Sequence, residues 1–163
     1  MRNNIVNQNW ERTMQPQIFA NKLVKLLPQL MKEISRHENN YISNGKMTCQ
    51  QFITLETISR KDDWCMNELV ESLDSSFSTI TGMVDRLVNL ELASRHRGDA
   101  DRRKVYVSIT QKGRKIVNEV LSQKREGIEQ VFKRLTPEER QLYLEIIEKL
   151  STSLASTKGE VLC

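Results

Sequence analysis

The sequence predicts a mainly α-helical protein with one small two-stranded β-hairpin. Apolar residues recur at three- and four-residue spacing over most of the chain, which is the pattern of amphipathic helices. Near residue 105 the pattern changes to alternation, which is typical of a strand. The length of 163 residues suits one compact unit with a real hydrophobic core.

The N-terminal third of the chain is expected to contain two helices. Residues 1–16 are rich in asparagine and predict an irregular N-terminal arm. Residues 17–37 then place their apolar side chains on one helical face. After a polar connection, Thr48 and Gln51 match the capping-box pattern, in which the two side chains satisfy free backbone amides reciprocally. This box predicts a second helix that ends near Ser59.

Two short helices joined by a tight polar turn come next. The first covers residues 66–73, the second covers residues 77–90, and the Asp-Ser-Ser sequence between them consists of capping residues. This pair is the pattern of a helix-turn-helix. The strand predicted at 105–109 then pairs with residues 93–97 across a polar tip, which completes the hairpin.

Two more helices complete the chain. Residues 111 to about 132 have helical spacing, and Thr-Pro-Glu-Glu at 136–139 begins the last helix with a second capping box. This order of elements is that of a winged helix-turn-helix at 46–110, flanked by a helical dimerisation region at 17–45 and 111–163. The apolar stripes of that region predict a homodimer, because a small domain could not cover so much apolar helix alone.

The second helix of the helix-turn-helix is expected to expose small and basic side chains. Short hydroxyl groups on such a face can hydrogen-bond to base edges in the major groove of duplex DNA, where a basic residue meets phosphate. A solvated helix face would have a similar composition. The candidate DNA-binding residues on this face are Ser75, Ser76, Ser78, Thr79, Thr81, Gly82 and Arg86.

The predicted hairpin is strongly basic. Between residues 95 and 115, eight basic residues stand against two acidic ones. An arginine at the tip of such a hairpin can enter the narrow minor groove, and an acidic residue nearby can hold its guanidinium in place. The alternative is a solvated turn. The candidate DNA-binding residues of the hairpin are Arg97, Asp101, Arg102, Arg103 and Lys104.

The same residues resemble the MarR family of bacterial regulators. The run from Asp101 to Gly113 is similar to the wing signature D-x-R-x-x-x-V-x-L-T-x-x-G, with Ile109 in place of leucine. Residues 67–69 and 79–87 resemble the two motif helices of that family. The resemblance implies a two-fold dimer that binds a pseudo-palindromic site in double-stranded DNA.

The resemblance also implies residue roles and a mode of regulation. Arg103 matches the minor-groove residue and Asp101 matches its brace, while Thr79 and Thr81 are expected to face bases. MarR regulators usually repress genes. They release DNA when a small phenolic or other lipophilic compound binds between the dimer helices and the DNA-binding lobe, or when a cysteine is oxidised.

The sequence departs from the MarR pattern at three positions. Glu91 replaces a frequent glycine before the first wing strand, which implies a different helix ending. Cys49 replaces a common proline, and Cys65 replaces a serine or threonine that caps a helix. Both cysteines fall at predicted helix starts, where the helix dipole favours the reactive thiolate, so cysteine-based redox sensing is an alternative mode of regulation. Two inert, partly buried thiols would leave the same pattern.

Several other classes of protein are not supported. The sequence has only two histidines, and it lacks H-E-x-x-H, G-x-S-x-G and a glycine-rich phosphate loop. These features argue against an enzyme. Three cysteines without C-x-x-C spacing argue against structural zinc and disulfides, and they fit a reducing cytoplasm. The sequence contains neither an apolar run of membrane-spanning length nor a signal-peptide core. We therefore expect a cytoplasmic protein without a cofactor or metal.

The sequence leaves the effector site and one rival function open. Candidate pocket residues are His37, Tyr41, Phe52 and Trp64, although such side chains in helices usually belong to the core or the surface. The rival function is a winged-helix module that binds protein, because a fold alone does not determine function. Arginines at the predicted wing tip favour DNA.

Overall fold

The structure, a computed structural model, describes residues 15–36, 38–98 and 104–159, with side chains as far as residue 154. The chain forms two compact units where the sequence predicted one. Unit 1 is drawn from residues 1–36 and 126–163, and unit 2 from residues 37–125. The boundary at residue 125 falls inside one long helix, α6, so the spacing of apolar residues gives no sign of it.

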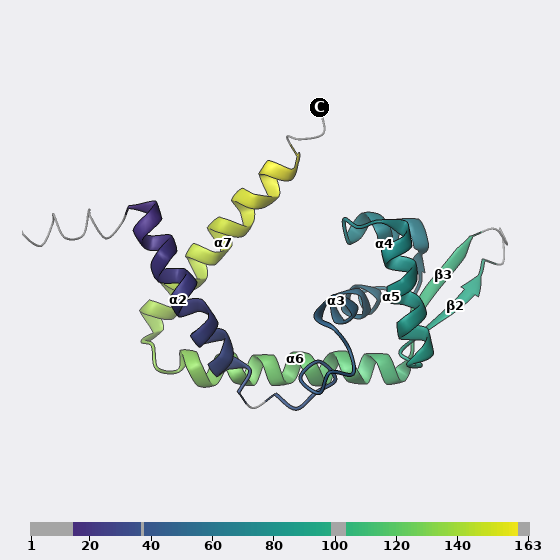
Figure 1. The fold of residues 1–163 in the computed structure, drawn as a ribbon, viewed down its shortest axis with the longest axis horizontal. Coiled ribbons are helices and arrows are strands. Elements are labelled where there is room, and N and C mark those ends of the chain that lie inside the picture. Colours follow the sequence, from purple (N-terminus) through teal and green to yellow (C-terminus); the bar gives the residue numbers. More distant parts are fainter. Residues whose placement is uncertain (1–14, 37, 99–103, 160–163) are drawn as a thin grey trace, which may run out of the picture. The chain divides into compact units, whose positions relative to one another are not determined.

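Unit 1 consists of helices. It contains α2 (Pro16–Ile34), the end of α6 (Gln111–Phe132) and α7 (Pro137–Gly159), as Figure 1 shows. The backbone of α6 passes so close to α2 that a Cβ atom on Gly127 would lie 2.1 Å from the carbonyl oxygen of Ile34. The predicted capping box of α7 is confirmed, because Glu139 accepts from the Thr136 amide at 2.8 Å and Thr136 accepts in return at 3.2 Å.

Unit 2 combines helices with a small sheet. Its helices are α3 (Cys49–Ile58), α4 (Met66–Ser72), α5 (Phe77–Asn89) and the first part of α6. The predicted hairpin is confirmed as β2 (Ala93–Arg97) and β3 (Val105–Ile109), which pair antiparallel. A third strand, β1 (Trp64–Cys65), pairs with the other edge of β3 and was not predicted. Two residues are too few to show alternation, so only the pairing reveals this strand.

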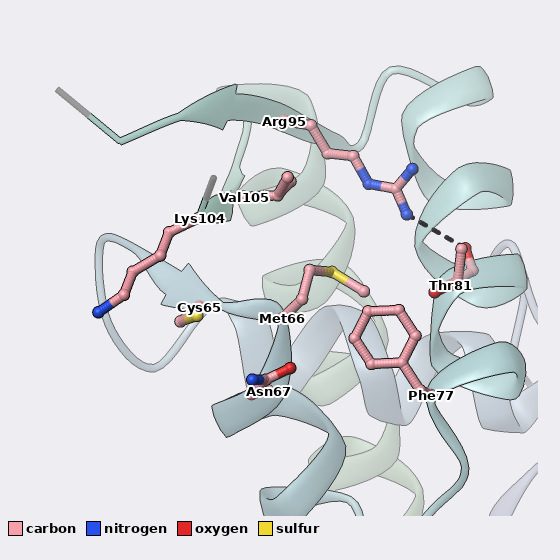
Figure 2. Close-up of a pocket in the computed structure, with 8 residues that line it drawn as sticks. All are labelled: Cys65, Met66, Asn67, Phe77, Thr81, Arg95, Lys104 and Val105. Atoms are coloured by element: carbon pink, nitrogen blue, oxygen red, sulfur yellow. Dashed lines mark hydrogen bonds between the residues drawn. The ribbon is translucent and has the colours of Figure 1, made fainter. Parts of the chain in front are cut away.

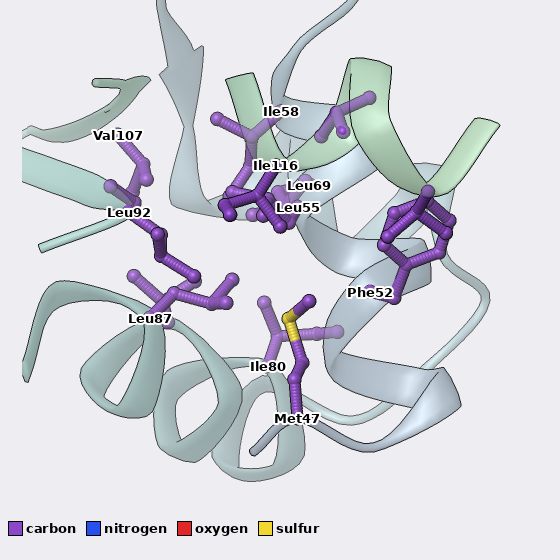
Figure 3. Close-up of a cluster of buried hydrophobic side chains, with 14 of the residues drawn as sticks. Met47, Phe52, Leu55, Ile58, Leu69, Ile80, Leu87, Leu92, Val107 and Ile116 are labelled. Carbon is purple, nitrogen blue, oxygen red and sulfur yellow. The ribbon is translucent and has the colours of Figure 1, made fainter. Parts of the chain in front are cut away.

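One hydrophobic core holds the elements of unit 2 together. Leu55 of α3, Leu69 of α4, Leu87 of α5 and Val107 of β3 all have 0% exposure, and Ile116 of α6 packs in the same cluster. Figure 3 shows these side chains converging from the helices and the sheet. Such close packing fixes where α4 and α5 lie relative to the hairpin, and therefore fixes the helix-turn-helix.

The helix ends of unit 2 follow local capping rules. The predicted capping box of α3 is confirmed, with Thr48 and Gln51 exchanging bonds of 2.9 and 3.2 Å. Asp74, in the turn between α4 and α5, has φ 46°. Glu91, just after α5, has φ 62°, and the Leu92 amide donates to the Leu87 carbonyl at 2.9 Å. The different helix ending expected from Glu91 is therefore wrong, because α5 ends with a left-handed residue at the position where the MarR pattern often has glycine. Among the described helices, none combines the length and apolarity needed to cross a membrane.

Candidate nucleic-acid interface

The start of α5 carries a linked group of exposed hydroxyl side chains. Ser76 caps the helix by accepting from the Thr79 amide at 3.2 Å. The Ser76 hydroxyl also lies 2.7 Å from that of Thr79 and 3.1 Å from that of Ser78. All three residues are exposed. Such short hydroxyls can exchange their mutual bonds for bonds to base edges or phosphates.

The remaining candidate residues of α5 differ in exposure. Gly82 and Arg86 are exposed, and a Cβ atom on Gly82 would find open space. Ser75, in the turn, is half-buried. The hydroxyl oxygen of Thr81 is buried and has no hydrogen-bond partner among the described residues, so Thr81 does not present it to a ligand outside the helix in this conformation. Of the two threonines expected to face bases, only Thr79 has an exposed side chain.

The described part of the wing is basic and exposed. The Gly98 amide donates to the Lys104 carbonyl at 3.0 Å and continues the strand pairing toward the tip. Arg97, at the end of β2, and Lys104, just before β3, are both exposed. The candidates Asp101, Arg102 and Arg103 lie outside the described residues.

Arg95 contacts the candidate site, and the sequence prediction did not select it as a site residue. Its Nη1 pairs with the Asp85 carboxylate, and its Nη2 donates to the Thr81 carbonyl at 3.2 Å. Both partners lie on α5. A signal for this contact exists in the sequence, because alternation from the buried Ala93 turns Arg95 toward the interior, where an arginine needs a partner.

Other basic residues of the predicted basic stretch are also engaged within the protein. Lys112 donates to the Leu90 carbonyl at 2.9 Å and to Glu91 at 2.8 Å. This bond raises the pKa of Lys112 and lowers the pKa of Glu91. Arg114 donates to the Ser59 carbonyl at 3.4 Å. The count of basic residues therefore exceeds the number of cations free to meet DNA, and Lys112 balances the negative charge that Glu91 brings near α5.

A cavity of about 300 Å³ opens between α4, α5 and the wing strands. Figure 2 shows Met66 and the ring of Phe77 on one side, with Arg95 reaching across to α5. Phe77 is 54% exposed, although it is a large aromatic side chain. The Arg95 Nε and Thr81 Oγ1 atoms are buried, and within the part of the chain that the structure describes they have no hydrogen-bond partner. The cavity is lined by Cys65, Met66, Asn67, Phe77, Thr81, Arg95, Lys104 and Val105.

The three described pocket candidates lie elsewhere in unit 2. Phe52 is 3% exposed and belongs to the core, while Tyr41 and Trp64 are half-buried and pack against it. Lys61 Nζ lies 4.1 Å above the ring of Trp64. His37 lies outside the described residues. None of the three described side chains lines the cavity beside α5.

The two candidate redox residues occupy different surroundings. Cys49 begins α3 and is exposed. Cys65 is the N-cap residue of α4 and is half-buried beside the cavity. The backbone amide of Cys65 donates to Glu68 at 3.2 Å, and Lys61 donates to the same carboxylate at 2.6 Å. Among the described residues, no group of three or more histidine, cysteine and acidic side chains is arranged to hold a metal ion.

This fold and surface define a class of protein. A helix-turn-helix that exposes short hydroxyl side chains beside a basic wing is the architecture of a DNA-binding transcriptional regulator. Residues 37–120, just over half of the chain, match the family model of the transcriptional regulator SarA/Rot. The chain therefore belongs to the SarA/Rot family of transcriptional regulators, and it is not an enzyme.

Two similar proteins confirm the predicted MarR-type fold. The HTH-type transcriptional regulator YpoP of Bacillus subtilis is 30% identical over 125 residues, which are 77% of this chain and 88% of YpoP. The crystal structure of a MarR variant from Escherichia coli is 26% identical, with a TM-score of 0.60, and the match covers 78% of this chain and 95% of that protein.

Two further solved structures share the fold at lower identity. FabT of Streptococcus pneumoniae, solved in complex with DNA, is 18% identical with a TM-score of 0.72, covering 88% of this chain and 99% of FabT. BpsR of Bordetella bronchiseptica, whose DNA binding is regulated by 6-hydroxynicotinic acid, is 23% identical with a TM-score of 0.58, covering 85% and 94%. These two likenesses show the fold alone.

Proposed function

We propose that the protein binds specific sites in double-stranded DNA as a homodimer, with α5 in the major groove and the wing in the adjacent minor groove. This proposal rests on the exposed hydroxyl side chains at the start of α5, which are those of Ser76, Ser78 and Thr79. Gly82 and Arg86 extend that surface, and Arg97 and Lys104 provide cations on the hairpin. Phosphate contacts from the wing would then position the hydroxyls over base edges.

The dimer is supported by unit 1, and the dimerisation region is proposed at residues 17–45 and 111–163. Helix α7 exposes a run of large apolar side chains, and α2 exposes others. Exposed apolar surface of this extent marks an interaction site. The partner that we propose is a second copy of the chain, because transcriptional regulators of this class bind two half-sites as two-fold dimers. Examples on α7 are Leu142, Leu144, Ile146, Ile147, Leu150 and Leu154.

Selection of bound sequences from a random DNA pool tests the DNA-binding proposal. We expect two half-sites, with centres about one helical turn apart, as for a two-fold dimer. The affinity for the selected duplex should fall steeply with salt, with a log–log slope of about −0.9 for each phosphate contact. A flat salt response would favour the protein-binding module instead.

The oligomeric state tests the dimer separately. Sedimentation of the wild type should give twice the chain mass. Ile147→Asp should shift the protein to monomers, because an unpaired charge within an apolar interface is strongly unfavourable. Glu148→Asp, at the neighbouring exposed position on α7, is the control and should remain a dimer. A monomeric wild type would contradict this part of the proposal.

We further propose that the protein is a repressor released by a small aromatic acid. The cavity beside α5 supports this, since its volume is at the lower end of ligand pockets and its walls combine the Phe77 ring with the Lys104 cation. A ligand there would touch both α5 and the wing. The pocket expected from the MarR resemblance, between the dimer helices and the DNA-binding lobe, remains a prediction.

The effector proposal has a defined probe. Titration with 6-hydroxynicotinic acid should weaken binding of the wild type to its selected duplex. Phe77→Ala, which removes the aromatic wall, should reduce this response. Ile53→Ala is the control, because Ile53 is exposed on α3 and does not line the cavity. If a saturating concentration of 6-hydroxynicotinic acid left the affinity for the selected duplex unchanged, small aromatic acids would be rejected as effectors.

Oxidation of Cys49 or Cys65 is the alternative trigger. The position of Cys65, which caps α4 and lines the cavity, favours Cys65 over Cys49 for such a role. Operator affinity should then fall on treatment with peroxide in the wild type and stay constant in Cys65→Ser. An affinity that peroxide leaves unchanged in the wild type would remove this alternative.

A further inference from the structure

We propose that Arg95 is a positioning residue that fixes the wing to α5, so that the two elements read a DNA site as one rigid unit. The inference rests on the proposed DNA-binding function. It concerns the selectivity between DNA sequences more than the strength of binding. The observation behind this inference is that one guanidinium on a wing strand contacts two residues one turn apart on the DNA-facing helix.

The geometry of the contact restrains both distance and rotation. Arg95 lies in the middle of β2, opposite the fully buried Val107 of β3. Its guanidinium pairs with the carboxylate of Asp85 and donates to the carbonyl of Thr81, which lies four residues earlier on α5. A planar group with two separate acceptors allows little rotation of the helix against the strand, whereas a single point contact would allow more.

The clamp lies where the apolar packing of β2 ends, while Val107 and Val105 of β3 still pack in or against the core. On the inner face of β2, Ala93 is 3% exposed and belongs to the core, while Arg97 toward the tip is exposed. Arg95 stands between them, with its side chain 28% exposed. On β2, the core therefore holds the base and Arg95 holds the middle. Without the clamp, only the packing of β3 and its pairing with β1 would hold the middle of the wing.

The clamp also neutralises a negative charge on the DNA-facing helix. The Asp85 side chain is 53% exposed and adjoins the exposed Arg86. An unpaired carboxylate there would repel phosphate. Removing Asp85 or Arg95 therefore breaks the same clamp but has opposite electrostatic effects, and this opposition separates positioning from simple attraction to DNA.

The test compares Asp85→Asn and Arg95→Gln with the wild type. Affinity is measured for the selected duplex and for a scrambled duplex of equal length. The scrambled duplex should bind Asp85→Asn more tightly and Arg95→Gln more weakly. The ratio of specific to scrambled affinity should nevertheless fall about tenfold in both variants, the size of one lost charge-assisted contact. The double variant should have no lower ratio than either single variant, because both remove one shared interaction.

Two controls address general damage to the fold. Glu68→Gln breaks the Lys61–Glu68 ion pair, whose side chains are 42% and 54% exposed in the same unit, and it should leave the ratio unchanged. Asp85→Glu keeps the carboxylate and should retain most of the selectivity. If Arg95→Gln does not fold, Asp85→Asn still decides the question, since it replaces a half-exposed side chain with one of the same shape.

The outcomes are distinguishable from failure of the proposed function. A wild type that does not discriminate between the two duplexes overturns both the DNA-binding proposal and this inference. A wild type that discriminates, together with an Asp85→Asn variant that keeps the full ratio, overturns only the inference. Ratios that fall independently and multiply in the double variant would also overturn it, because Asp85 and Arg95 would then act separately.

Discussion

A methyl group added at Gly113 tests how α6 is joined to the DNA-binding unit. The Cβ atom of Gly113→Ala would lie 2.1 Å from the carbonyl oxygen of Leu92 and 2.9 Å from Cγ1 of Ile109. Ordinary contacts between such atoms are about 3.5 Å, so α6 would have to move away by more than an ångström. The Leu92 carbonyl also accepts from the Thr110 amide at 3.0 Å, and that bond would be lost.

The expected cost follows from these terms. Overpacking costs about 1–3 kcal/mol, and one lost hydrogen bond adds about 1 kcal/mol. Replacing glycine by alanine within a helix stabilises the folded state by about 1 kcal/mol, which offsets part of this loss. We therefore expect Gly113→Ala to reduce the free energy of unfolding by about 1–3 kcal/mol. The melting temperature should fall by about 2–4 °C for each kcal/mol.

Chemical denaturation followed by circular dichroism measures this change. The matched control is Gly82→Ala on α5, where a Cβ atom meets nothing within 4 Å. That variant should gain about 0.5–1 kcal/mol, because only the helix propensity changes. If Gly113→Ala proved as stable as the wild type, the close approach of α6 to Leu92 would be refuted.

Three further predictions concern single sites. Gly127→Ala should lose about 1–3 kcal/mol in urea denaturation, since its Cβ would lie 2.1 Å from the Ile34 carbonyl oxygen; unchanged stability would contradict the α2–α6 contact. Cys65→Ser should gain about 0.5–1 kcal/mol by the same method, because serine caps a helix better than cysteine; a loss would show that the thiol packs favourably. The hydrogen bond from Lys61 lowers the pKa of Glu68 from 4.5, so the stabilisation that this bond gives the folded state is present above pH 4.5 and disappears as the pH falls below it. Glu68→Gln should therefore flatten the acid limb of the curve of unfolding free energy against pH. An acid limb identical to that of the wild type would exclude this contribution.

Local patterns predicted the elements well. The capping boxes at Thr48 and Thr136 lie where expected, and the strands β2 and β3 have the predicted bounds. These features depend on residues within three or four positions of each other, or on alternation over five residues. Such short-range preferences are present in the chain before it folds.

Features that depend on distant residues were not predicted. Strand β1 has two residues and exists only because β3 lies beside it. The burial of the Thr81 hydroxyl and the contact between Arg95 and Asp85 both require the hairpin to fold onto α5. Charge counting treated Arg95 and Lys112 as free cations, because a sum over a sequence window does not include partners outside it.

The sequence by itself determined the winged helix-turn-helix, since the order of helices and strands and their caps follow from local spacing. It also located the hydroxyl-rich start of α5. The tertiary structure decided which basic residues remain available, how the wing is held and where a cavity opens. The physical reason is that these properties depend on the distances between elements, and the burial of a shared core sets those distances only when the chain folds.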